Sequence, residues 1–161
     1  AVLARRGLRV PYVGPSNRKG ARAVGEVLAR KLGPGAAVAI VEGLPTVESS
    51  RDRRAGFEEA ARVGGLRVVA VQSAQWDMGK ATEIVSGLLV AHPDLRGVLC
   101  ANDTMALGAV AALRAAGKRG TVDVVGFDHI DAIKPLVRTG DVLATADMHA
   151  DRLAAYGVDY A

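Results

Sequence analysis

Short apolar runs alternate with amphipathic segments along most of the chain. The apolar runs are rich in Val and nearly continuous in hydrophobicity, which is typical of strands buried on both faces of a sheet. They predict strands over Leu8–Val13, Ala37–Val41, Leu66–Val71, Val98–Ala101, Val122–Phe127 and Val142–Ala146. The segments between them predict helices over Lys19–Leu32, Ser50–Val63, Met78–His92, Thr104–Ala116 and Ile130–Thr139, with one more beginning near His149.

Glycine and proline support these limits. Gly33 and Pro34 follow the first predicted helix, Pro93 follows the third and Gly117 the fourth, as residues that end helices do. Strict alternation of strand and helix with short connections indicates βαβ units. The sequence therefore predicts an α/β domain with a doubly wound parallel sheet of the Rossmann or flavodoxin-like kind.

Composition agrees with one folded domain. The chain has 161 residues, of which 50% are hydrophobic and 24% charged, and no apolar run approaches the length of a membrane span. The net charge of +4 comes from scattered arginines, which argues against a nucleic-acid surface. The one cysteine, Cys100, excludes an intramolecular disulfide and is expected to be a small buried side chain.

Polar side chains follow five successive predicted strands. Parallel strands deliver the residues at their carboxyl ends to one edge of the sheet, where ligands of such folds bind. The residues at these ends are Glu42, Gln72, Asn102, Asp103, Asp128 and Asp147. The pattern predicts a polar binding site at that edge.

Several of these residues also have a purely structural interpretation. Asp103 is expected to cap the following helix, which leaves Asn102 for a ligand. Asp128 either caps a helix opening at Ile130 or binds, and Trp76 is either a core residue or a ligand contact. The cluster Arg51–Arg54 is either a solvated first helical turn or part of the site. Positive charge at the amino terminus of a helix opposes the helix dipole, which favours a functional reason for these arginines.

The residue types favour a polyhydroxylated, uncharged small molecule. Arg, Asn and Asp offer paired donors and acceptors that match vicinal hydroxyls, and a Trp face suits the C–H side of a sugar ring. No phosphate loop follows a strand, and no serine has a G-x-S-x-G context. The histidines, at 92, 129 and 149, show no metal-ligand spacing. We therefore expect a binding protein, with no cofactor, no metal and no catalytic residues.

The motifs resemble those of a known family. "NRKGARAVGEVLARKLG", "SSRDRRAGFEEA", "AQWD", "ANDTMALGAVAALRAAGK", "DVVGFD" and "GDVLATADMHADRLAAYGVDYA" occur in the order and spacing of the ribose-type periplasmic sugar-binding proteins. These are the substrate-binding components of ABC sugar importers, and they share a fold with the sensor core of lactose-repressor-type regulators. The resemblance covers nearly the whole chain.

The resemblance implies two α/β lobes of the type I periplasmic-binding-protein fold, with the sugar held between them. This chain looks like the second, C-terminal lobe of such a protein, with a core over 16–148. Residues 1–15 and 149–161 would then be stubs of the first lobe, with crossings near Ser16-Asn17 and Met148-His149. Implied partners are a monosaccharide or polyol and the importer's membrane subunits, and the implied location is periplasmic or extracytoplasmic.

Site residues also follow from the resemblance. Arg53 matches the arginine that grips sugar hydroxyls, Trp76 the stacking aromatic, and Asn102 and Asp128 the amide and carboxylate that bind hydroxyls. Ser49 is a weaker match. Met148 departs from the family, which usually has Gln there, and His149 is a candidate to replace that amide.

The alternative function is the effector-sensing core of a lactose-repressor-type transcription regulator. Regulators usually read "P-x-L-T-T" before the second crossing, whereas this chain reads "GDVLATAD", which favours the importer component. An enzyme on the same sheet would need a nucleophile or an acid–base pair, and none is evident. A single lobe is expected to bind sugar at millimolar level or not at all, and to self-associate through its uncovered apolar surface.

Overall fold

The computed structural model describes residues 15–149. Its centre is a five-stranded parallel sheet in the order β2-β1-β3-β4-β5. The strands are β1 (Ala37–Glu42), β2 (Arg67–Ser73), β3 (Leu95–Cys100), β4 (Asp123–Asp128) and β5 (Ala144–Asp147). This order confirms the predicted doubly wound α/β fold. The predicted strand Leu8–Val13 and the helix expected after His149 lie outside the described residues.

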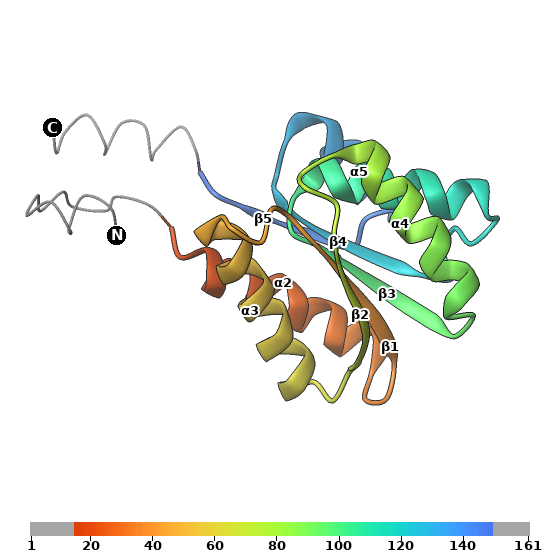
Figure 1. Cartoon of the computed structure of the whole chain (residues 1–161), viewed down its shortest axis with the longest axis horizontal. Coiled ribbons are helices and arrows are strands. Elements are labelled where there is room, and N and C mark those ends of the chain that lie inside the picture. Colours follow the sequence, from red (N-terminus) through yellow and green to blue (C-terminus); the bar gives the residue numbers. More distant parts are fainter. Residues whose placement is uncertain (1–14, 150–161) are drawn as a thin grey trace, which may run out of the picture.

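Helices cover both faces of the sheet. They are α2 (Asn17–Leu32), α3 (Glu48–Val63), α4 (Met78–Ala91), α5 (Asp103–Ala115), the 3-10 turn η1 (Asp131–Ile133) and α6 (Lys134–Thr139). Helices α2 and α3 pack together on one face, and α4 and α5 pack together on the other (Figure 1). Because all neighbouring strands are parallel, the loops that lead from a strand to the following helix all lie at the carboxyl end of the sheet.

Two element boundaries differ from the sequence prediction for clear reasons. The helix predicted over Ile130–Thr139 is divided into η1 and α6, and Pro135 lies in the first turn of α6. Proline has no N–H to continue a preceding helix but fits a first turn, so a new helix begins there. Strand β3 begins at Leu95 rather than Val98, because its backbone already pairs with β1 at Ala37.

The core is built from the sheet and the small residues that let helices approach it. All of β1 is buried, and Phe57, Leu28 and Leu99 are among the largest fully buried side chains. A Cβ on Gly25 would lie 2.7 Å from the Ala60 Cβ, so α2 and α3 meet closely only because position 25 is glycine. Cys100 is fully buried as predicted, and burial raises the pKa of its thiol.

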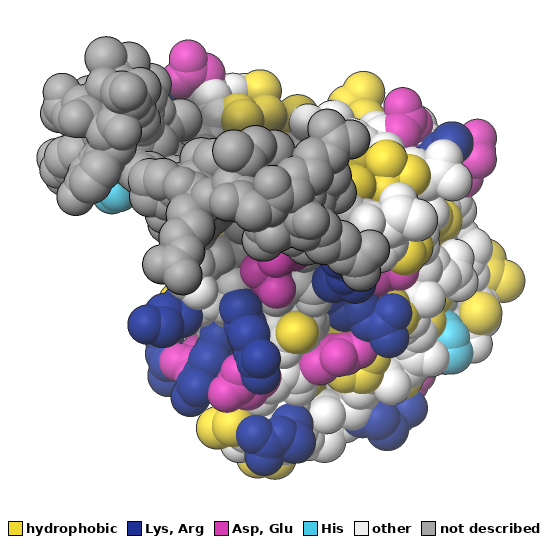
Figure 2. Space-filling model, turned by 60° about the vertical axis from the view of Figure 1, so that its left-hand side comes forward, with side chains coloured by type: hydrophobic (Ala, Val, Ile, Leu, Met, Phe, Trp, Pro, Cys, Tyr) yellow, Lys and Arg dark blue, Asp and Glu magenta, His cyan; other side chains and the backbone are white. Residues whose placement is uncertain are grey.

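The surface shown in Figure 2 carries interleaved acidic and basic side chains. On helices α2 and α3, Arg22 pairs with Glu59 at 2.8 Å and with Glu26 at 2.7 Å. Such exposed pairs contribute little stability. Within residues 15–149, no helix combines the length and the apolar character needed to cross a membrane.

Asp141, three residues before β5, connects the start of that strand to helix α5 through its carboxylate. Its carboxylate accepts hydrogen bonds from Arg114 at 2.9 Å, from Arg119 at 3.0 Å and from Thr139 at 2.9 Å. The side chain is only 3% exposed. Hydrogen bonds from Arg119 and then Thr139 and Arg114 lower the pKa of Asp141 from 3.8 to about 2.

This lowered pKa predicts acid sensitivity. The carboxylate binds its proton less tightly in the folded chain than in the unfolded chain, so its contribution to stability is complete above pH 4 and disappears as the pH falls towards 2. We expect Asp141→Asn to reduce the free energy of unfolding at pH 7 and to flatten its decline between pH 4 and pH 2. Urea unfolding at a series of pH values measures both effects. Parallel pH curves for the two proteins would contradict the assignment.

Candidate functional site

Arg53 lies at the centre of the polar edge predicted from the sequence. It belongs to the second turn of α3, which follows β1, and it is only 9% exposed. Its Nη1 donates to the Ala101 carbonyl at 2.8 Å and pairs with Asp128 Oδ1 at 2.9 Å. Its Nε donates to Asn17 Oδ1 at 2.9 Å. Three segments far apart in the sequence therefore converge on one guanidinium.

Aromatic rings also contact this guanidinium. Its central carbon lies 3.9 Å from the centroid of the Phe127 ring and 5.7 Å from that of Trp76. The shorter distance corresponds to direct stacking, in which a cation interacts with the negative face of the ring. The two rings and the ion pair hold the Arg53 side chain in one orientation.

Trp76 occupies a sharp turn between β2 and α4. Both Gln75 and Trp76 have positive φ, at 55° and 67°, a region that side-chain-bearing residues seldom adopt. A Cβ on Gly43 would lie 2.1 Å from the Trp76 ring, so the indole packs directly on the backbone that follows β1. Trp76 is half-buried and touches the hydrophobic core, which supports both interpretations of this residue.

Asp128 ends β4 and points its carboxylate at Arg53. Its φ is 102°, and that of His129 is 55°. Burial raises the pKa of the Asp128 carboxyl above its usual value, and the charge and hydrogen bond of Arg53 offset part of that rise. The capping alternative for Asp128 is wrong, because Ile130 is the residue that precedes η1 and no side chain caps it.

The prediction that Asp103 caps α5 is wrong. Asn102, not Asp103, caps α5, because its Oδ1 accepts the Met105 N–H at 2.8 Å. Asp103 is fully buried and accepts hydrogen bonds from Ile130 and Thr145 instead. With its oxygen engaged in the cap, Asn102 retains its amide NH2 as the group for a ligand. Its role as a ligand contact stays a prediction.

The other predicted residues lie around this centre. Ser49 is half-buried in the first turn of α3, one helical turn before Arg53. Met148 follows β5, is half-buried and packs against the core. Asp147 is exposed and pairs with His129 at 3.3 Å, while His149 lies next to it with an Nδ1 to Asp147 distance of 3.5 Å. Ligand roles for Ser49, Met148 and His149 stay predictions.

Sequence reasoning missed two residues of the site. Asn17 accepts the Arg53 Nε–H, and Phe127 stacks on the guanidinium. The sequence places Phe127 directly before Asp128, and strand alternation puts these side chains on opposite faces. The twist of the chain at Asp128, where φ is positive, brings both to Arg53. No local pattern marks Asn17 as its partner.

The arrangement lies at the topological switch of the sheet. In the strand order β2-β1-β3-β4-β5, successive strands are added in one direction from β1 to β2 and in the other direction from β3 onward. The switch point therefore lies between β1 and β3, and ligands of this fold bind beyond the carboxyl ends of these two strands. Arg53 and Gly43 follow β1, and Ala101 and Asn102 follow β3. The site therefore offers a buried cation, a part-exposed carboxylate and an indole at the position where this fold binds ligands.

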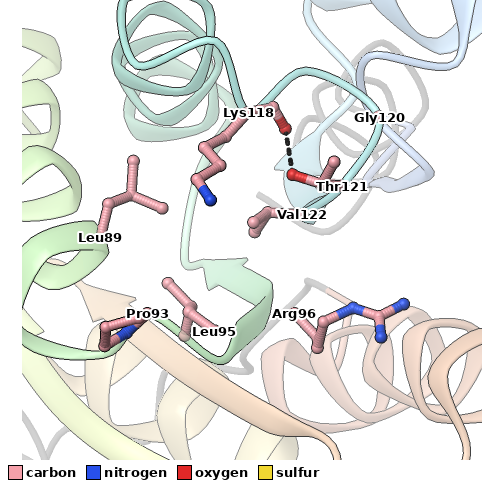
Figure 3. A pocket seen from close by; sticks show the side chains of 8 residues that line it. All are labelled: Leu89, Pro93, Leu95, Arg96, Lys118, Gly120, Thr121 and Val122. Atoms are coloured by element: carbon pink, nitrogen blue, oxygen red, sulfur yellow. Dashed lines mark hydrogen bonds between the residues drawn. The ribbon is translucent and has the colours of Figure 1, made fainter.

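A hollow of about 390 Å³ lies at the opposite edge, by the amino ends of β3 and β4 (Figure 3). Lys118 points its ammonium into this hollow, whereas the Arg96 guanidinium points away from it. The Thr121 hydroxyl already donates to the Lys118 carbonyl at 2.8 Å. The polar groups here do not converge, and none of the predicted site residues lines the hollow.

Comparison with known proteins places the chain in a class. A model of the periplasmic binding protein domain matches residues 2–161. The chain therefore belongs to the periplasmic binding protein family, and the resemblance drawn from the motifs is confirmed.

Two relatives of this chain are named as sugar-binding proteins. The D-ribose/D-allose-binding protein of Pseudomonas aeruginosa is 49% identical over 99% of this chain, and the ribose import binding protein of Escherichia coli is 37% identical over 98%. The chain spans about half the length of these curated relatives, 50% and 53% respectively.

Solved structures show the same relation. A solute binding protein of an ABC transporter from Burkholderia multivorans superimposes with a TM-score of 0.94 at 52% identity, covering 98% of this chain and 56% of that one. A periplasmic solute binding protein from Actinobacillus succinogenes, with bound D-allose, gives 0.93 at 34% identity, covering 97% and 56%.

The contact between Gly43 and Trp76 predicts an optical effect. Gly43→Ala places a methyl group where the indole lies, so the ring has to move towards water. We expect the emission of Trp76, the single tryptophan, to shift to longer wavelength. Gly87→Ala is the matched control, because its Cβ meets no atom within 4 Å. Unchanged emission in a folded Gly43→Ala protein would contradict the packing.

The capping assignment predicts a stability change. Asn102→Ala removes the acceptor for the Met105 N–H and is expected to lower the free energy of unfolding by about 1 kcal/mol. Asn102→Ser retains a capping oxygen and should recover most of this loss. Urea unfolding followed by circular dichroism measures the difference. Equal stability of Asn102→Ala and the unmodified chain would contradict the capping role of Asn102.

Proposed function

We propose that this chain binds a monosaccharide or polyol as one lobe of the substrate-binding component of an ABC-type sugar importer. The observation that carries the proposal is the buried Arg53, held against Asp128 and Trp76 at the switch point of the sheet. The alternative function, the effector-sensing core of a transcription regulator, has less support. The curated relatives described above are named as ribose-binding or allose-binding proteins.

The recognition chemistry follows from the groups present. The Asp128 side chain is 34% exposed, so its second oxygen remains accessible to accept a hydrogen bond from a sugar hydroxyl. A neighbouring hydroxyl then accepts from the Asn102 amide or from Arg53, which gives the alternation of donors and acceptors that vicinal hydroxyls need. Trp76 supplies an apolar face for the ring carbons.

The relatives support a pentose or hexose as the ligand. The proteins from Pseudomonas aeruginosa and Escherichia coli are named for ribose or allose, and the Actinobacillus succinogenes structure contains D-allose. We infer D-ribose and D-allose as the first ligands to examine. Binding needs no covalent step, so none of the site residues is assigned a catalytic role.

The shared length with these relatives supports a one-lobe arrangement. In this proposal residues 16–148 are the core of one lobe, and a second lobe closes on the carboxyl edge of the sheet. Leu44 and Val47 lie in the loop after β1, and Met78 is the first residue of α4. These three side chains are 38–49% exposed and would contact the other lobe or a second copy of the chain. The proposed location is periplasmic, and the proposed partners are the importer's membrane subunits.

The sugar-binding site is tested by titrating the chain with D-ribose and D-allose while recording Trp76 emission. We expect a saturable change at millimolar concentration, because one lobe supplies only part of the hydrogen bonds that enclose a sugar. Asp128→Ala and Arg53→Lys should abolish the change. An uncharged non-sugar such as ethylene glycol reports non-specific effects.

Asp131→Asn is the matched control for Asp128→Ala. Asp131 lies three positions further along the chain, and its side chain is 97% exposed and pairs with Lys134. It should leave the titration unchanged. Micromolar binding by the chain alone would contradict the one-lobe arrangement, and a response that survives Asp128→Ala would contradict the site.

A further inference from the structure

We propose that Asp103 is a positioning residue of the site, which holds the turn after β4 so that the Asp128 carboxylate points at Arg53. The expected effect of Asp103 on sugar affinity rests on the proposed function. The positioning itself is a property of the chain without ligand.

Asp103 fixes the turn through both carboxylate oxygens. Oδ2 accepts the backbone N–H of Ile130 at 3.0 Å, and Oδ1 accepts the Thr145 hydroxyl at 2.7 Å. The Thr145 Oγ1 in turn accepts the N–H of His129 at 3.3 Å. The two backbone amides that follow Asp128 are thus held from α5 and from β5.

The turn needs such support because of its backbone. Asp128 and His129 both have positive φ, at 102° and 55°. For residues with side chains such conformations are unfavourable and persist only where the surroundings enforce them. Without the bonds to Ile130 and His129, the turn would relax and move the Asp128 side chain away from the guanidinium.

The Asp103 carboxylate packs closely against strand β4. Asp103 is fully buried, and a Cβ on Gly126 would lie 2.1 Å from its Oδ1. Glycine at 126 therefore leaves room for the carboxylate against β4. Both groups that Asp103 contacts through its oxygens are donors, which matches a side chain that only accepts.

The cost of this placement argues against a purely packing role. Burial raises the pKa of the Asp103 carboxyl, and the hydrogen bonds from Thr145 and Ile130 offset part of that rise. A buried acid is expensive, and an apolar residue would fill the same space more cheaply. What an apolar residue lacks is the acceptor pair that fixes Ile130 and Thr145.

The first test uses nitrogen-15 magnetic resonance of the Arg53 guanidinium. In the unmodified chain its Nη1 and Nε protons, bound to Asp128, Ala101 and Asn17, should exchange slowly with water. We expect Asp103→Ala to accelerate this exchange by about tenfold or more, in line with coupling between residues of one network. Asp103→Asn keeps an acceptor for Ile130 and should show a smaller effect, as should Thr145→Val.

The second test measures D-ribose and D-allose affinity. Asp103→Ala should weaken binding by about tenfold, and Asp103→Asn, which keeps an acceptor for Ile130, should weaken it less. Asp141→Ala is the matched control, because it removes a similarly enclosed aspartate at the opposite edge of the sheet. It should lower stability without altering Arg53 exchange or affinity.

The outcomes separate the two proposals. Unchanged Arg53 exchange in folded Asp103→Ala and Thr145→Val proteins would overturn the positioning role, even where sugar binds normally. Accelerated exchange in Asp103→Ala, with no sugar binding by the unmodified chain, would support the positioning role and count against the proposed function. If Asp103→Ala does not fold, Asp103→Asn and Thr145→Val decide the question.

Discussion

A nearly buried guanidinium constrains this molecule more than any other single group. Removing Arg53 from water costs several kcal/mol unless its donors find partners, and those partners come from the start of α2, the end of β3 and the end of β4. Phe127 covers one face of the cation. The sheet order and the positions of three connections are therefore coupled to one side chain, which serves the fold and the proposed site together.

The start of α5 connects that cation to the rest of the edge. Three successive residues there have separate tasks: the Ala101 carbonyl accepts from Arg53, the Asn102 side chain caps the helix, and the Asp103 carboxylate binds the turn after β4 and the strand β5. Such a division explains why two strongly polar side chains stand together after an apolar strand. One would have been enough for capping alone.

Much of this could be predicted from the sequence, because the patterns involved are local. Strand and helix periodicity located the elements, and parallel strands bring their carboxyl ends, including Asp128, to one edge. Arg53 and Trp76 were singled out by the resemblance to a known family, and the structure brings both of them to Asp128. The roles of Asn102 and Asp103 could not be separated in this way. The Asp103 partner Thr145 is 42 positions away, and only the folded sheet shows that it lies beside this carboxylate. Asn17 was missed for the same reason.

Backbone geometry makes the adaptability of the site uneven. Asp128 and Trp76 stand on left-handed backbone, which Asn, Asp and Gly tolerate and β-branched residues do not. Ser49 and Met148 carry no such restriction. Descendants of this sequence that acquire a different ligand preference would thus change most freely at the periphery, at positions 49 and 148. Asp128 and Trp76 would be retained in most such descendants, while changes at the surrounding positions alter which ligand is preferred.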